Sequence, residues 1–152
     1  MRRLLLGAFA CAVLGGSLCC AAQDKGYWRA TSTQANKITG DLTIGDARLT
    51  INFTGYTLAL IHKLGPAEMG AAFDADVNNP GAGNLYRLDI PADKRFSHHN
   101  TLCGSEDTQW MAIYVDGKDL QVLFFSGGEM PVLSGEALAN SSNVCGRFGY
   151  ER

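Results

Sequence analysis

Alternation of apolar and polar side chains in residues 48–62, RLTINFTGYTLALIH, constrains the fold more than any other feature of the chain. A period of two residues is typical of a β-strand with one buried face. With a two-residue turn at Thr54 and Gly55, the segment becomes a hairpin with one wholly apolar face. The expected apolar pairs are Phe53 with Tyr56, Ile51 with Leu58, and Leu49 with Leu60.

A second hairpin is predicted over residues 110–125, WMAIYVDGKDLQVLFF, with its turn at Asp116 and Gly117. A two-residue turn and a four-residue loop both leave the same side chains on each face. The predicted core face carries Met111, Ile113, Val115, Leu120, Val122 and Phe124. The opposite face is too apolar to meet water entirely, so the hairpin is central or this face is a binding surface formed by Trp110, Tyr114, Leu123 and Phe125.

Weaker patterns complete the predicted architecture. Short strands are expected over residues 41–44, 84–90 and 144–150, the last with Val144, Phe148 and Tyr150 on one side. Short helices are expected over 32–38 and 134–140, the second capped by Ser134. The sequence therefore predicts a mainly β fold, an antiparallel β-sandwich or small β-barrel with one or two short helices.

The first 22 residues have the layout of a secretory signal peptide. Arg2 and Arg3 precede an apolar stretch, and small residues lead to an expected cleavage site after Ala22. We expect residues 23–152 to form a single β-rich domain that is periplasmic or secreted. Lipid attachment at Cys19 or Cys20 is the minor alternative, because Leu18 and Cys19 are poor residues to precede a lipidated cysteine.

Cys103 and Cys145 are the two cysteines that follow the predicted signal peptide, and an exported chain with one such pair is expected to join them in a disulfide. The chain has 13 basic and 15 acidic residues. Arg2 and Arg3 are the only charged residues in segment 1–22, so 11 basic residues and a net charge of −4 remain after it. This balance argues against nucleic-acid binding, and no later segment is apolar enough to predict a transmembrane span.

His98 and His99 lie four to five residues before Cys103 in FSHHNTLCG, which raises the question of a metal or catalytic site. Adjacent side chains point apart on an extended chain, and a disulfide removes the thiolate that either chemistry needs. A zinc site would lack ligands, with only His62 and carboxylates left. We therefore expect a polar loop here and a hydrogen-bonded role for His62 at the rim of the first hairpin.

Asp74, Asp76 and Asn78 match the first three ligand positions of an EF-hand loop. Asn79 and Leu85 replace the glycine and the glutamate that such a loop requires, so turn chemistry explains this segment better than calcium binding.

No Gly-x-Ser-x-Gly nucleophile motif occurs in the chain. The acidic pairs Glu106 with Asp107 and Asp116 with Asp119 fall in expected turns, although the sequence alone leaves a carboxylate dyad open.

Three short motifs together, ITGD (38–41), NTLCG (100–104) and CGRFGY (145–150), resemble a pattern in small exported bacterial proteins of uncharacterised function. The resemblance implies an exported domain with a single disulfide and implies no activity. Small β-barrel lysozyme inhibitors of the bacterial envelope are similar in size, location and disulfide use, but their reactive motifs have no counterpart here.

We therefore expect an exported, non-enzymatic binding protein without a cofactor, of the envelope inhibitor or immunity type. Its expected partner is another envelope or extracellular protein. The alternatives are a small envelope hydrolase that uses carboxylates or histidine, and a carrier of a small ligand or metal.

Overall fold

Nine strands form one antiparallel sheet in the computed structural model, which describes residues 23–78 and 81–152. The predicted signal peptide, residues 1–22, lies outside the described residues. The strands are β1 (Gly26–Ala30), β2 (Leu42–Ile44), β3 (Arg48–Ile51), β4 (Thr54–Thr57), β5 (Ala59–Lys63), β6 (Ala82–Ile90), β7 (Thr108–Asp116), β8 (Asp119–Ser126) and β9 (Val144–Glu151). Their spatial order is β4-β3-β2-β1-β9-β8-β7-β6-β5. The predicted mainly β, antiparallel fold is confirmed.

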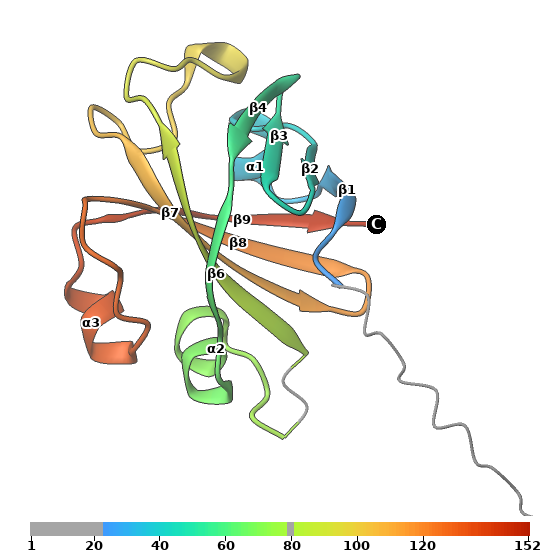
Figure 1. The fold of residues 1–152 in the computed structure, drawn as a ribbon, viewed down its shortest axis with the longest axis vertical. Helices are drawn as coiled ribbons and strands as arrows, with labels where there is room; N and C mark the ends of the chain where they lie inside the picture. The colour runs from blue at the N-terminus through green and yellow to red at the C-terminus, as the bar shows by residue number, and fades with distance from the viewer. Residues whose placement is uncertain (1–22, 79–80) are drawn as a thin grey trace, which may run out of the picture.

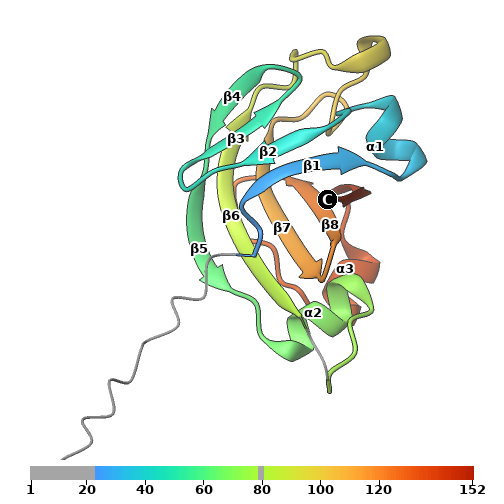
Figure 2. The same ribbon diagram turned by 90° about the vertical axis from the view of Figure 1, so that its right-hand side faces the viewer.

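The sheet is bent so that β1–β4 lie over β6–β9, as Figures 1 and 2 show. Strand β1 joins the two layers, because Gly26 to Trp28 pair with β2 whereas Arg29 and Ala30 pair with β9. At the other side, β4 and β5 follow each other with only Leu58 between them. These two end strands do not pair with each other in the described sheet, so the sandwich-like alternative holds rather than a closed barrel.

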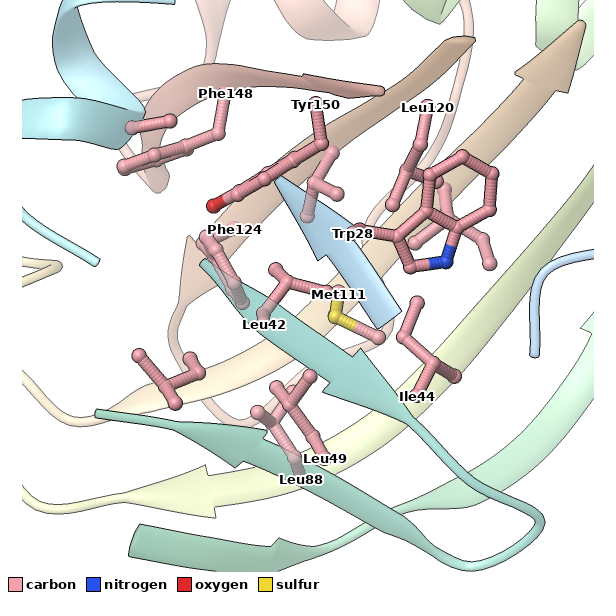
Figure 3. Packing of buried hydrophobic residues seen from close by; sticks show 14 of the residues in the cluster. Trp28, Leu42, Ile44, Leu49, Leu88, Met111, Leu120, Phe124, Phe148 and Tyr150 are labelled. Atoms are coloured by element: carbon pink, nitrogen blue, oxygen red, sulfur yellow. The ribbon is translucent and has the colours of Figure 1, made fainter. Parts of the chain in front are cut away.

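The main core fills the space between the two layers, and Figure 3 shows its centre. The period-two prediction for the second hairpin is confirmed here, because the predicted core face of β7 and β8 is buried in this cluster. The opposing layer contributes the alternate residues of β1, β2 and β3. The largest fully buried side chains of this core include Trp28, Leu42, Ile44, Leu49, Ile51, Tyr86, Phe124, Phe148 and Tyr150.

A second apolar cluster lies on the outer face of β6–β8, beneath two helices. These are α2 (Pro66–Phe73) and α3 (Gly135–Asn140), which contact each other (Figure 1). The cluster buries all four residues of the predicted binding surface, Trp110, Tyr114, Leu123 and Phe125, each less than a tenth exposed. The surface interpretation is therefore wrong, because Met69 and Phe73 of α2 and Leu133 before α3 cover this face. The other interpretation, a central hairpin, is confirmed by the position of β7 and β8 inside the sheet.

Two helices match the prediction and one was missed. Helix α1 (Thr33–Lys37) begins after Ser32, whose hydroxyl accepts a hydrogen bond from the N–H of Ala35. Ser134 caps α3 in the same way. Helix α2 had no predicted counterpart, although Pro66 at its first turn and Glu68 bonded to the N–H of Gly65 are typical starting signals.

The first hairpin exists, but its predicted turn is wrong. The turn lies at Asn52 and Phe53, with φ of 48° and 63°, and Ile51 pairs with Thr54. The true register therefore places Phe53 in solvent instead of in the core. Gly55 lies on β4 rather than in the turn, and a Cβ there would displace the Arg48 guanidinium that lies against it.

Two smaller corrections concern the other strands. The second turn lies at Gly117 and Lys118, one residue later than predicted, because Asp116 pairs with Asp119. Val144 packs with the second cluster rather than beside Phe148 and Tyr150, since a register shift separates it from them along β9.

The predicted disulfide is present. Cys103 and Cys145 are joined with their Cα atoms 4.9 Å apart, and the bridge ties the loop before β7 to the start of β9.

A buried polar cluster closes the end of the sandwich near the start of the described chain. The Asp24 carboxylate accepts hydrogen bonds from the Tyr86 hydroxyl and from Asn84 Nδ2, the latter at 3.0 Å. Its backbone oxygen accepts one from Trp28 Nε1 at 2.9 Å. These partners satisfy a group that would otherwise be costly to bury, so residue 24 belongs to the folded domain.

Stability at alkaline pH should depend on two buried phenols, Tyr86 and Tyr150. Burial raises the pKa of each above the ordinary value of 10.0, and for Tyr86 the hydrogen bond to Asp24 raises the pKa further. A raised folded-state pKa means stabilisation that is complete below the unfolded value and is lost above it. We expect the free energy of unfolding to begin to fall near the ordinary phenol pKa of about 10 and to keep falling as the pH rises toward the raised folded-state values, measured by rapid denaturant titration. Tyr150→Phe should show a shallower fall, and an equally steep one would contradict this assignment.

Candidate functional site

Backbone strain is concentrated at one end of the molecule. Five described residues other than glycine have positive φ, and four of them form two turns. One turn is Asn52–Phe53 between β3 and β4, and the other is His98–His99, with φ of 56° and 62°, in the short 3₁₀ turn η1 (Ser97–His99). Figure 1 shows both turns at the top of the sandwich. Bulky residues rarely adopt this conformation, and such strain clusters at functional sites.

An open groove of about 380 Å³ lies between these two turns and runs onto the outer face of β1–β3. We call it the tip groove. Lys94 Nζ, from the loop that leads to η1, donates to Thr54 Oγ1 at 3.2 Å and holds the two turns together. The residues that line the groove include Tyr27, Asp41, Thr43, Thr50, Asn52, Phe53 and Ser97.

The sheet explains why these side chains face outward. Along β1, β2 and β3 every second residue enters the core, and Trp28, Leu42 and Leu49 are among those buried. The alternate residues therefore face the groove. Tyr27 is 58% exposed, and Phe53 at the turn is fully exposed. Helices α2 and α3 lie on the outer face of the opposite layer, so they do not cover this one (Figure 2).

Tyr27 and Asp41 form the charged part of the groove. The Tyr27 hydroxyl donates to Asp41 Oδ2, and the N–H of Ala30 donates to Oδ1 at 2.8 Å. These hydrogen bonds hold the pKa of Asp41 below its usual range, so the carboxylate stays ionised at neutral pH. The same contact raises the pKa of Tyr27.

The groove offers binding groups rather than a catalytic set. Asp41 is its single carboxylate among the lining residues, and no histidine is among them. A glycosidase-type mechanism needs two carboxylates and a general base needs a partner within reach. Across residues 23–78 and 81–152, no three His, Cys, Asp or Glu side chains gather closely enough to hold a metal ion.

The other residues singled out in the sequence lie apart. His98 and His99 are exposed in η1, as the predicted loop implies. His62 Nε2 lies 3.1 Å from Glu68 Oε1, which confirms its hydrogen-bonded role. Asp76 accepts from the N–H of Asn78 in a local turn, and Asn79 lies outside the described residues.

The two acidic pairs noted in the sequence lie outside the tip groove. Glu106 accepts from the Ser126 hydroxyl at 2.6 Å near the disulfide. Asp116 and Asp119 face each other at the end of the β7–β8 hairpin.

The tip groove was not predicted from the sequence, because the predicted turn placed Phe53 in the core and no strand was predicted at Tyr27. The pair Asn52–Phe53 carried a usable signal, since asparagine tolerates a left-handed turn.

Comparison with known proteins adds no assignment: no protein-family model matches the chain, and no curated protein or solved structure matches it significantly. Among the helices of the described chain, none has the length and apolar character needed to cross a bilayer.

Proposed function

We propose that this chain is an exported, non-enzymatic binding protein that recognises another envelope or extracellular protein through the tip groove, as an inhibitor or immunity factor would. The observation that carries the proposal is Phe53, a fully exposed aromatic residue held at φ 63° on the end of a hairpin. A left-handed conformation costs about 1–2 kcal/mol for such a residue. The Phe53 ring packs in neither of the two core clusters, and aromatic anchors dominate protein interfaces.

The rigidity of the turn supports the same proposal. Asn52 and Phe53 form a two-residue turn between paired strands, and Lys94 braces the following Thr54. A side chain presented on a fixed backbone loses little entropy when it inserts into a partner's cleft. The disulfide supports export in turn, because such bonds persist in oxidising compartments. Cleavage after Ala22 would give the mature form.

Replacing Phe53 should separate stability from binding. Phe53→Gly is expected to raise the free energy of unfolding by about 0.5–1 kcal/mol, because glycine adopts positive φ without strain. The same change should abolish capture of the partner from an envelope extract by the oxidised protein, with captured proteins identified by mass spectrometry. Val132→Ala is the matched control, since Val132 is also exposed (66%) but lies outside the groove, before α3. Equal capture by wild type and Phe53→Gly would contradict the proposal.

A further inference from the structure

Three residues that line the tip groove form a row across neighbouring strands, and a fourth extends the row past the groove lining. Tyr27 on β1 pairs with Thr43 on β2, Thr43 pairs with Thr50 on β3, and Thr50 pairs with Gly55 on β4. We call these four residues the floor row. The side chains of Tyr27, Thr43 and Thr50 stand on the outer face, because their strand neighbours are buried in the core. The row therefore runs from an exposed aromatic ring through two threonines to a glycine that lies beside the Arg48 guanidinium.

The two ends of the floor row lie beside charges of opposite sign. Asp41 lies beside Tyr27 and accepts its hydroxyl proton in a hydrogen bond. At the other end the Arg48 guanidinium lies against Gly55, where a Cβ would overlap it. The floor row thus has a hydrogen-bond acceptor, Asp41, at one end and a donor group, Arg48, at the other. Between them lie the hydroxyls of Thr43 and Thr50, each of which can both donate and accept hydrogen bonds.

This chemistry selects among ligand classes. A nucleic acid would bring phosphates to Asp41 in a chain of net charge −2, and its binding normally requires an excess of cations. A peptide strand that pairs by its backbone needs a sheet edge rather than a sheet face. An acyl chain would leave the charged groups and hydroxyls along the floor row without hydrogen-bond partners. A short chain of pyranose rings fits all of them, because one face of such a ring is made of C–H groups that stack on an aromatic ring, its edge carries hydroxyls, and several linked rings can span the four strands.

We propose that the floor row of the tip groove binds a short oligosaccharide, with Tyr27 stacked on one sugar ring and Thr43, Thr50, Asp41 and Arg48 bonded to hydroxyls of that ring and of its neighbours along the row. The inference goes beyond the proposed function, because it assigns a second class of ligand to side chains other than the Phe53 anchor. A glycan-bearing partner would engage both parts of the groove at once.

The test is an NMR titration of the isotope-labelled, oxidised chain of residues 23–152 with chitotetraose, cellotetraose, maltotetraose and mannotetraose. At least one of these sugars is expected to shift the amide signals of Tyr27, Thr43 and Thr50. Tyr27→Ala should weaken that sugar's affinity about tenfold, whereas Tyr27→Phe, which keeps the ring, should weaken it only about threefold. The double change Thr43→Val with Thr50→Val should weaken it about fivefold through lost hydrogen bonds.

Two further variants make the assignment specific. Gly55→Ala displaces Arg48, a flexible side chain, and should weaken sugar binding while leaving the fold intact. Thr33→Val is the control, because Thr33 is an exposed threonine of α1 outside the groove and should bind like the wild type.

Two outcomes would overturn the inference. One is the absence of shifts at these amides with all four sugars at millimolar concentration. The other is unchanged affinity in Tyr27→Ala. Phe53→Gly separates the two proposals, because it should lose the protein partner yet keep sugar affinity within about threefold. Capture of a protein partner without any response to the sugars would leave the proposed function standing alone.

Discussion

Replacing Cys103 and Cys145 together by serine is expected to lower the free energy of unfolding by about 4 kcal/mol. The two cysteines are 42 positions apart, and the bridge removes the entropy of that loop from the unfolded chain. Nothing else covalent links the loop before β7 to β9 among the described residues. For a domain of this size the loss is a large share of the net stability.

Denaturant titration of the oxidised protein, the reduced protein and the double serine variant measures this effect. The last two should unfold at the same denaturant concentration, because both lack the same constraint. Alkylation of the unreduced, unfolded protein gives the control: two labelled thiols per chain would show that the bond does not form.

Trp28→Ala is expected to lower the free energy of unfolding by about 3–5 kcal/mol, as removal of a buried aromatic residue generally does. Trp28 is fully buried and lies in the core between the layers, near Leu120 and Ile44 in Figure 3. Its Nε1 donates to the backbone oxygen of Asp24, and the Arg152 guanidinium stacks over its ring at 4.5 Å. The change leaves a cavity between the layers and an unpaired buried oxygen.

The measurement is again denaturant unfolding, with Tyr27→Ala as the neighbouring control on the opposite face of β1. That exposed residue should change the free energy of unfolding by about 0.5 kcal/mol at most. Trp28→Phe, which refills most of the cavity, should lose roughly half as much as Trp28→Ala. Equal stability of Trp28→Ala and wild type would contradict the two-layer core.

The sequence predicted which faces are apolar far better than what covers them. Alternation identified Met111 and Phe124 as core residues, because burial on one face of a strand repeats every two residues. The same alternation showed that Trp110 and Phe125 need cover, but it could not show whether helices or a partner provide it. Helix α2 does so from only eight residues, PAEMGAAF, too short to give a clear helical period.

The tip groove could not be predicted because the turn of the first hairpin was placed two residues too late in the sequence. Glycine is the usual turn residue, so Gly55 was a reasonable position, and both registers keep most apolar side chains on one face. The two registers differ in the contact between Arg48 and Gly55 and in the left-handed conformation of Asn52 and Phe53. Both features are visible only in the folded structure. Moving the turn transfers Phe53 from the interior to the solvent, and the candidate site moves with it.

Strand β9 lies between β1 and β8, so one of the two neighbours of the earliest described strand is the latest one. Contacts between such distant parts of a chain form late and slow the folding reaction. A ribosome-bound chain that still lacks residues 144–151 would hold an incomplete sheet, with β1 and β8 each missing a partner. Until the last strand is available, these unpaired edges are open to pairing with other chains.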